Sequence, residues 1–414
     1  MRSCFFVYIC GNRPATMEKL FQIFSSRVQA VDTSFRRYLW YDIDWKNRLI
    51  AITGARGTGK TTLLLQYIKE TFGNNLGEVF YASLDNLFFT TTTLSDFADN
   101  FVKRGGKFLF LDEVHKYHDW SLEIKNIYDN YPQLSIVFTG SSALDIFRGN
   151  ADLSRRLLHY TLSGLSFREF IELKYHHRFP VFSLNDVTEK AFDISSAINT
   201  VIKPVKLFEE YQKIGYYPFF AEDEKNYSQR LLQTINQTLE SDLPAVAKIG
   251  YSSVYALRKL FAVIAETVPF KPNILKLSQQ IGIDRETLLK YLHLLAKADL
   301  LLLLNADTRG ISQLNKPDKV YLNNPNMMYA LVESAVNTGT MRETFFYNQT
   351  RIRHTINYTD KGDFLVDRKF VFEVGGKNKT QQQIAGIPNA FIAADNIEYP
   401  WNNTIPIWMF GFLY

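Results

Sequence analysis

The chain contains the sequence Ile52-Thr-Gly-Ala-Arg-Gly-Thr-Gly-Lys-Thr-Thr-Leu-Leu-Leu-Gln66, from which the rest of its fold can be predicted. The residues Arg48 to Thr53 have the apolar character of a buried strand, and Thr62 to Glu70 has the composition of a helix. Between them lies the spacing Gly-x-x-x-x-Gly-Lys-Thr, in which small residues let backbone N–H groups curl around phosphates at a helix N-terminus. The sequence therefore predicts a phosphate-binding P-loop rather than an ordinary glycine-rich turn.

Each polar position of this loop has an expected role in holding ATP. Lys60 is expected to reach the β- and γ-phosphates, while the hydroxyl of Thr61 ligates Mg²⁺ and Thr62 supports the α-phosphate side. Arg56 lies close to the phosphates because of its place inside the loop. The residues predicted to bind the nucleotide are Gly54, Arg56, Gly57, Thr58, Gly59, Lys60, Thr61 and Thr62.

A second motif downstream provides the acids that a P-loop requires. The run Lys107-Phe-Leu-Phe-Leu-Asp-Glu113 predicts a buried strand that ends in two carboxylates. Asp112 is expected to bind Mg²⁺ through water, and Glu113 stands where a general base could polarise the attacking water. A strand cap would give a similar pattern, but the P-loop upstream favours the catalytic interpretation.

The surrounding pattern predicts an α/β fold. Apolar runs at Val79 to Ser83 and Ser135 to Phe138 alternate with helical segments, which indicates a P-loop NTPase parallel sheet with helices on both faces. Polar residues at the carboxyl ends of such strands meet at one edge. Thr139 is therefore a candidate catalytic sensor of the γ-phosphate, with Ser141 as the next choice. Capping of a helix that starts near Ala143 is the other interpretation of these hydroxyls.

Arginines are relevant because a guanidinium can neutralise charge that develops on the γ-phosphate. Arg155 and Arg156 follow the helix predicted after Ala143. Either could be a catalytic finger that acts on its own subunit or on a neighbouring one, and Arg156 is taken as the candidate. A solvated surface pair is the alternative.

Composition limits the class of protein. The chain has 414 residues, a net charge of +5 and two cysteines, Cys4 and Cys10, so charge does not identify a partner and no disulfide framework is expected. The longest strongly apolar run, Leu300 to Leu304, falls far short of the roughly 20 residues of a membrane helix. We expect a cytoplasmic protein without a membrane partner. Met1 to Ala15 imitates a short secretory signal, but we expect translation to start at Met17.

With these motifs in place, the chain resembles a prokaryotic family of AAA-like P-loop ATPases that carry a C-terminal restriction-endonuclease-like domain. The stretches that carry the resemblance are Ile52 to Gln66, Leu111-Asp-Glu-Val-His-Lys116, Phe138-Thr-Gly-Ser-Ser142 and Leu165-Ser-Phe-Arg-Glu-Phe170. The last of these is more diagnostic than the P-loop, which many families share. The resemblance implies an additional-strand, catalytic-glutamate fold that uses ATP and Mg²⁺, and it assigns no cellular role.

A helix-turn-helix pattern follows the ATPase half. A short helix, Ile274 to Gln280, precedes Gly282-Ile283, and Asp284 is the N-cap of a second helix that ends at Lys297. Strand-like Leu300 to Asn305 and Lys319 to Leu322, with a loop at Arg309-Gly310, complete a predicted winged helix. Its second helix offers Arg285, Thr287 and Lys290 to DNA, with Arg285 and Lys290 expected on one face. Winged helices also act as lids or protein docks.

The last ninety residues contain Glu343, Asp363 and Glu373 in an order that resembles the PD-(D/E)XK nuclease core. In a working core a lysine stands two residues after the strand glutamate, and here that position is Gly375. Lys377 is the nearest substitute, but a regular strand places it too far along unless Gly375 and Gly376 form a bulge. The sequence therefore predicts a domain that does not cut DNA.

These observations divide the chain into five predicted segments. They are a start extension at 1–16, the P-loop domain at 17–170, a helical lid or connector at 171–250, the winged helix at 251–325 and the endonuclease-like domain at 326–414. The predicted function is Mg²⁺-dependent ATP hydrolysis that drives or switches a process involving nucleic acid or protein. A slow signalling switch and a nucleotide-gated nuclease are the alternatives, and homo-oligomers are compatible with each.

Overall fold

The structure is a computed structural model that describes residues 14–73, 75–140, 153, 155–244, 250–267, 269, 271–307, 316–331 and 337–414. Cys4, Cys10, Ser141, the helix expected near Ala143 and the Arg309-Gly310 loop lie outside these residues. The chain forms two compact units, Met1–Leu162 and Ser163–Tyr414. This division comes shortly before the boundary predicted at residue 170.

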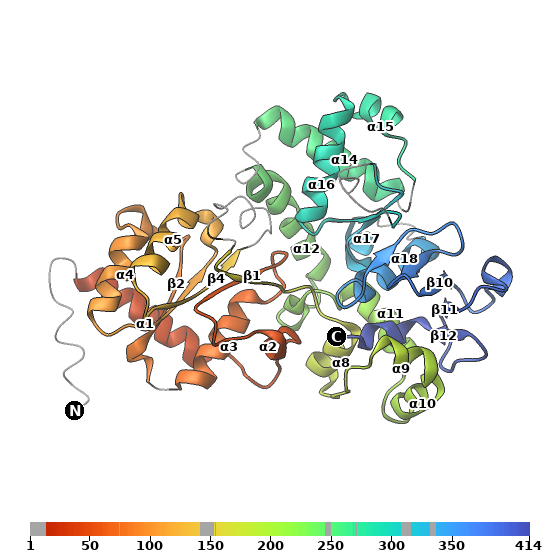
Figure 1. Ribbon diagram of the computed structural model, residues 1–414, viewed down its shortest axis with the longest axis horizontal. Helices are drawn as coiled ribbons and strands as arrows, with labels where there is room; N and C mark the ends of the chain where they lie inside the picture. The colour runs from red at the N-terminus through yellow and green to blue at the C-terminus, as the bar shows by residue number, and fades with distance from the viewer. Residues whose placement is uncertain are drawn as a thin grey trace. The chain divides into compact units, whose positions relative to one another are not determined.

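The first unit is a five-stranded sheet with helices on both faces (Figure 1). Its strands follow the order β2-β3-β4-β1-β5, and every neighbouring pair is parallel. Its elements are α1 (Pro14–Ala30), α2 (Leu39–Asp42), β1 (Leu49–Thr53), α3 (Lys60–Phe72), η2 (Leu76–Glu78), β2 (Val79–Ser83), η3 (Leu87–Thr90), α4 (Leu94–Lys103), β3 (Phe108–Asp112), η4 (Val114–Lys116), α5 (Trp120–Asn130), β4 (Ser135–Gly140) and β5 (Leu158–Thr161).

The strand order separates the two motifs in a particular way. β1 leads into the P-loop and β3 ends at Asp112, while β4 lies between them and pairs with both. This inserted strand is the additional strand that the family resemblance implied. Because all five strands run in the same direction, the loop, the acids and Thr139 meet at the carboxyl edge of the sheet.

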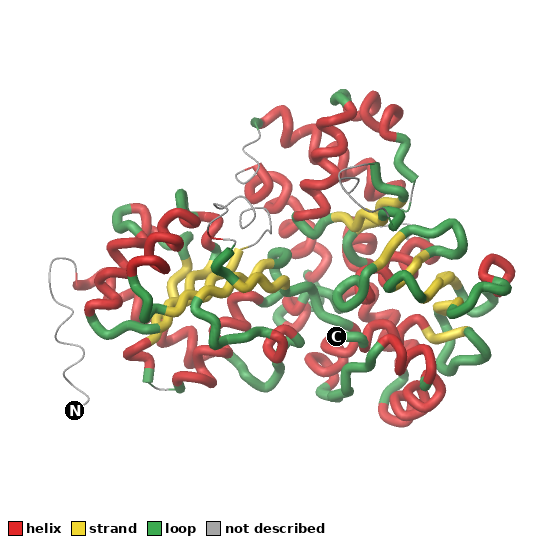
Figure 2. The backbone as a smooth tube through the Cα atoms, in the orientation of Figure 1, coloured by secondary structure: helices red, strands yellow, loops and turns green. Residues whose placement is uncertain are grey.

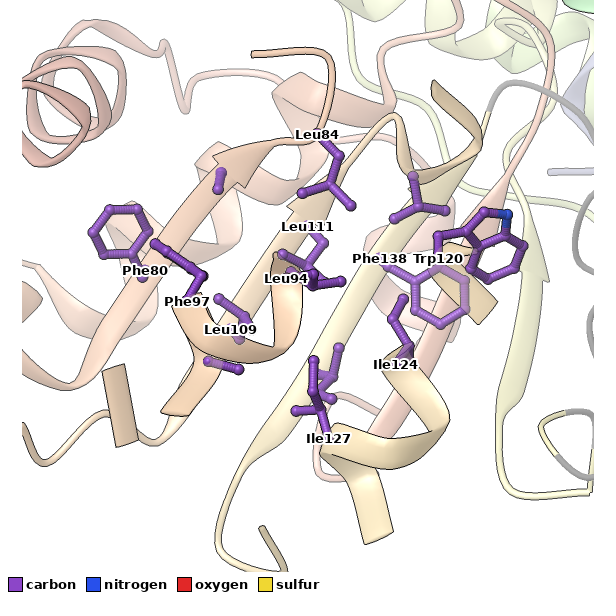
Figure 3. Close-up of a cluster of buried hydrophobic side chains, with 14 of the residues drawn as sticks. Phe80, Leu84, Leu94, Phe97, Leu109, Leu111, Trp120, Ile124, Ile127 and Phe138 are labelled. Carbon is purple, nitrogen blue, oxygen red and sulfur yellow. The ribbon is translucent and has the colours of Figure 1, made fainter. Parts of the chain in front are cut away.

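One face of the sheet packs on an amphipathic pair of helices. In α4 the buried residues Leu94, Phe97, Ala98 and Phe101 recur at the spacing of a single helical face. With Trp120, Ile124 and Ile127 of α5 they cover the apolar side chains of β2, β3 and β4 (Figure 3). This core fixes the strand ends that carry the polar residues described below.

The second unit is mostly helical, with its strands in short stretches (Figure 2). Its elements are α8 (Phe167–Tyr175), α9 (Leu184–Glu189), α10 (Ala191–Val201), α11 (Pro204–Ile214), η5 (Pro218–Ala221), α12 (Tyr227–Gln237), η6 (Thr238–Asp242), α14 (Tyr251–Thr267), α15 (Ile274–Ile281), α16 (Arg285–Lys297), β6 (Leu301–Leu304), β7 (Lys319–Leu322), α17 (Pro325–Leu331), α18 (Thr338–Thr350), β8 (Ile356–Asn357), β9 (Phe364–Val366), β10 (Phe370–Gly375), η8 (Gln381–Ile384), β11 (Ala390–Ala394), β12 (Thr404–Pro406) and η9 (Ile407–Phe412). Among the described helices, none combines the length and the apolar character needed to cross a membrane.

The helix-turn-helix elements form through the local signals that the sequence offers. Gly282 ends α15 in the left-handed region at φ 86°, and the carboxylate of Asp284 accepts a hydrogen bond from the N–H of Thr287 at 2.9 Å to start α16. β6 and β7 then pair as an antiparallel hairpin. The assignment of the whole segment as a winged helix stays a prediction.

The last part of the chain forms a mixed sheet in the order β12-β11-β10-β9-β8. The first connections are antiparallel, from β8 to β9 and from β9 to β10, whereas β11 and β12 run parallel to β10. α18 packs against β10 (Figure 1). This arrangement brings together Glu343 on α18, Asp363 just before β9 and Glu373 on β10.

The stretch Leu165 to Phe170 contacts the last residues of this unit. Ser166 caps α8, and its hydroxyl donates a hydrogen bond to the backbone oxygen of Tyr414 at 3.0 Å. The guanidinium of Arg168 donates to the same oxygen at 3.0 Å, and Phe167 contacts Phe412 edge to face. This motif, which is more diagnostic of the resemblance than the P-loop, therefore has a structural role in the second unit.

Candidate nucleotide-binding site

The P-loop takes its shape from glycines in the left-handed region. Gly54, Gly57 and Gly59 have φ of 150°, 83° and 94°. A Cβ on Gly54 would lie 2.2 Å from the backbone oxygen of Leu162, so this position has no room for a side chain. The loop thus packs against the chain after β5, and Gly59 leads directly into α3.

Lys60 lies buried inside the loop. Its ammonium donates hydrogen bonds to the backbone oxygens of Gly54 at 2.8 Å and Ala55 at 2.9 Å, and the residue is 5% exposed. The hydroxyl of Thr58 also donates to the oxygen of Ala55, at 2.9 Å. The predicted phosphate ligand is therefore in place at the start of α3, with loop carbonyls stabilising its charge. Thr62, the next expected ligand, is exposed in the same first turn of α3.

Asp112 collects hydroxyl donors from three other elements. The hydroxyl of Thr61 donates to one of its carboxylate oxygens at 2.6 Å, and that of Tyr81 donates to the same oxygen at 2.7 Å. Thr139 donates to the other oxygen. Burial and the charge of Asp112 raise the pKa of Tyr81 well above its usual value, so this phenol remains a donor. The two predicted metal ligands, Thr61 and Asp112, are thus in direct contact.

Glu113 is held in a strained backbone conformation at the same edge. Its φ of 54° lies in the left-handed region, which non-glycine residues seldom adopt. Its N–H donates to the hydroxyl of Thr139 at 3.1 Å, so Thr139 connects both acids. Its carboxylate lies 3.9 Å from the guanidinium of Arg56 and 3.5 Å from the imidazole of His115. The predicted base is therefore fixed beside the loop rather than free in solvent.

Arg156 lies away from this edge. It precedes β5, and β5 runs parallel to β1, so Arg156 stands at the amino end of the sheet. Its Nε lies 3.3 Å from a carboxylate oxygen of Asp129 at the end of α5. The four residues of β5 alone span about 13 Å. The length of the sheet therefore lies between Arg156 and the loop of its own chain, and a catalytic role for Arg156, in its own or in a neighbouring subunit, stays a prediction.

Two further residues support the site without having been predicted. The buried guanidinium of Arg37 donates to the backbone oxygen of Thr58, and His159 contacts the hydroxyl of Thr53 at 2.7 Å. Burial lowers the pKa of His159 below its usual value, which keeps the imidazole neutral. No local pattern marks these residues, because each reaches the loop from another segment.

Two of the three predicted DNA-contacting residues are exposed, whereas Thr287 is half-buried. Arg285 opens α16 and Lys290 lies further along the same helix, and both side chains are open to solvent. A separation of five residues turns about 140° around a helix. The expectation that the two share one face was therefore wrong; they share only the exposed half of α16.

The C-terminal acids lie together, but the lysine differs from the one predicted. Lys379, and not Lys377, forms an ion pair with Glu373. Lys319 lies between Glu343 and Asp363. Within the part of the chain that the structure describes, no three His, Cys, Asp or Glu side chains are placed to hold a metal ion.

Comparison with known proteins agrees with this geometry for the first half of the chain. Residues 46–171 match the family described as “AAA domain”. This segment is therefore similar to an AAA domain. Residues 205–338 match a family described only as a domain of unknown function, which leaves the winged-helix and endonuclease-like predictions without support from a family.

The similar protein with a curated description does not indicate the cellular function of this chain. An uncharacterized protein of Methanocaldococcus jannaschii is 28% identical over 269 residues, which cover 62% of this chain and 56% of that protein. The chain thus spans about half the length of this relative.

Two solved structures have low TM-scores. AMPPCP-bound DnaA from Aquifex aeolicus is 14% identical, with 69% of this chain and 88% of that chain covered and a TM-score of 0.25. The S. cerevisiae Hsp104–ADP complex is 16% identical, with 66% and 41% covered and a TM-score of 0.30. TM-scores of this size do not establish a shared fold.

Proposed function

We propose that the chain binds ATP with Mg²⁺ at the P-loop edge of the first sheet and hydrolyses it. The observation that carries this proposal is the hydrogen bond of 2.6 Å between Thr61 and Asp112. It joins the residue after the P-loop lysine to the acid at the end of β3, which are the two groups that a P-loop site uses for its metal. An ordinary glycine-rich turn gives no reason for this contact.

The residues present fit a magnesium ion. Mg²⁺ prefers hard oxygen ligands and keeps several waters, and this edge offers one hydroxyl and one buried carboxylate. Thr61 would hold the ion directly and Asp112 would hold it through water. When bound, the ion would neutralise charge on the β- and γ-phosphates.

The protein groups divide the remaining work. The ammonium of Lys60 exchanges its hydrogen bonds to the carbonyls of Gly54 and Ala55 for bonds to phosphate oxygens. Because these carbonyls belong to the loop itself, the side chain does not have to move far. Tyr81 and Thr139 orient Asp112 through their hydroxyls. Glu113 accepts the proton of the attacking water, and its fixed backbone limits where that water can stand.

The test compares Glu113→Gln with the wild type. The amide keeps the size of the side chain but removes the base, so ATP binding should persist while hydrolysis slows by roughly a hundredfold or more. Binding is measured by calorimetry and hydrolysis by phosphate release. Unchanged turnover would show that another residue positions the water.

The work that hydrolysis drives is a separate proposal. We propose a cytoplasmic process that involves nucleic acid or protein, with a winged helix at residues 251–325 as the docking element and a helical connector at 171–250. Arg285 and Lys290 on the exposed half of α16 support contact with DNA. Slow turnover with retained nucleotide would instead favour a signalling switch.

A further inference from the structure

The predicted endonuclease-like segment and strand β7, which precedes it, together form a charged cluster that the nucleotide site does not use. The ammonium of Lys319, from β7, lies 3.2 Å from a carboxylate oxygen of Glu343 on α18 and 3.2 Å from one of Asp363, which precedes β9. The three side chains are 17–18% exposed. One cation therefore bridges two largely buried acids that come from different elements.

Both acids also accept hydrogen bonds from other protein groups. The hydroxyl of Tyr321 donates to the oxygen of Glu343 that faces Lys319, at 2.7 Å. The second oxygen of Asp363 accepts the N–H of Val374 at 2.9 Å. The cluster is thus closed by hydrogen bonds as well as by charge.

Glu373 completes the cluster from the adjacent strand. Asp363 donates its N–H to the backbone oxygen of Phe372 at 2.9 Å, which places it beside Glu373 on β10. Glu373 is 3% exposed, and the ammonium of Lys379 pairs with its carboxylate. Three carboxylates consequently share two lysine cations inside one small region.

These residues do not fit a divalent metal ion. A nuclease metal would bind oxygens of the acids from the helix and the two strands, at distances of about 2.0–2.6 Å. Here the ammonium of Lys319 occupies the space between Glu343 and Asp363. The other acid is committed to Lys379.

We propose that Lys319 takes the place of a metal ion in this endonuclease-like domain, so that the acids are neutralised by the chain itself and the domain does not cut DNA. The acids follow one another in the order of the PD-(D/E)XK core, but the cation between Glu343 and Asp363 is a lysine side chain instead of a metal ion. The domain then serves as a stable structural or binding element of the second unit.

The electrostatics agree with this arrangement. Burial, and then the neighbouring charge of Asp363, raises the pKa of Glu343. Burial opposes the charge of Lys319, but the two carboxylates outweigh it and raise the pKa of the ammonium. Removing this cation would leave two buried carboxylates facing each other, which is costly unless another cation enters.

The test removes the ammonium of Lys319 and asks whether a metal ion from solution takes its place. Lys319→Met removes the charge at similar length, and Lys319→Arg is the matched control that keeps it. Both are made in an Asp112→Asn background without nucleotide, so that the P-loop contributes no metal site. Mn²⁺ is the probe, followed by calorimetry and thermal unfolding.

The Lys319→Met protein is expected to bind Mn²⁺ and to gain roughly 3 °C or more in melting temperature at saturating metal. In the Asp112→Asn parent and in the Lys319→Arg protein, Mn²⁺ should raise the melting temperature no more than it does in an Asp363→Asn protein. Absence of any Mn²⁺ effect on a folded Lys319→Met protein would refute the idea that the site is a metal site with its cation replaced.

A second measurement uses the wild type alone and does not depend on the folding of a variant. Plasmid DNA is incubated with the full chain, ATP and Mg²⁺ or Mn²⁺, and no cleavage is expected. Cleavage that disappears in Glu373→Ala would show that a metal displaces Lys319, and would overturn the proposal.

Discussion

Replacing Lys60 by alanine should weaken ATP binding by a calculable amount. Hydrogen bonds to charged groups contribute about 1.5–3 kcal/mol each, so two phosphate contacts would contribute about 3–6 kcal/mol. Binding also breaks the two bonds from Lys60 to the carbonyls of Gly54 and Ala55, at 2.8 and 2.9 Å, which offsets part of that gain. A net loss of about 2–4 kcal/mol corresponds to roughly 30- to 700-fold in Kd.

The assay is calorimetric titration of the folded variant with Mg-ATP. Lys69→Ala is the matched control, because Lys69 lies on the same helix and carries the same charge but donates to the backbone oxygens of Gln29 and Val31. Its affinity should stay within about twofold of the wild type, as expected for a charge outside the site. Equal affinity in Lys60→Ala and wild type would refute the P-loop assignment.

Three further predictions follow from named contacts. Gly54→Ala places a Cβ 2.2 Å from the oxygen of Leu162, so denaturant unfolding should show a loss of about 1–3 kcal/mol together with weaker ATP binding. Because burial lowers the pKa of His159, stability should fall as pH drops below the usual value of 6.5, and His159→Gln should reduce that fall between pH 7.5 and 5.5. Reversing Arg285 and Lys290 should weaken any DNA binding and flatten its salt dependence; unchanged affinity would indicate a protein dock or lid.

The parts that the sequence predicted depend on local signals. The glycine spacing and the apolar runs on either side define β1, the loop and α3 within one short stretch, and the cap at Asp284 does the same for α16. The roles of Asp112 and Glu113 were predicted because a buried strand followed by Asp-Glu downstream of a P-loop usually supplies the metal ligand and the catalytic base. Their meeting with Thr61 then follows from parallel strands.

The parts that the sequence missed depend on distant segments. Tyr81 reaches Asp112 only because β2 pairs with β3 in a particular register. The distance between Arg156 and the loop became clear only from the direction of β5. Lys319 comes from a hairpin that precedes the acids by many residues, so no spacing rule could connect it with Glu343 or predict that it would replace a metal.

Release of inorganic phosphate from ATP by the purified full chain, with Mg²⁺ and with EDTA, shows whether the P-loop edge hydrolyses ATP. We expect steady turnover with Mg²⁺, none above background with EDTA, and none in Lys60→Ala under either condition. Turnover that is absent with Mg²⁺, or that persists unchanged in Lys60→Ala, would contradict this expectation.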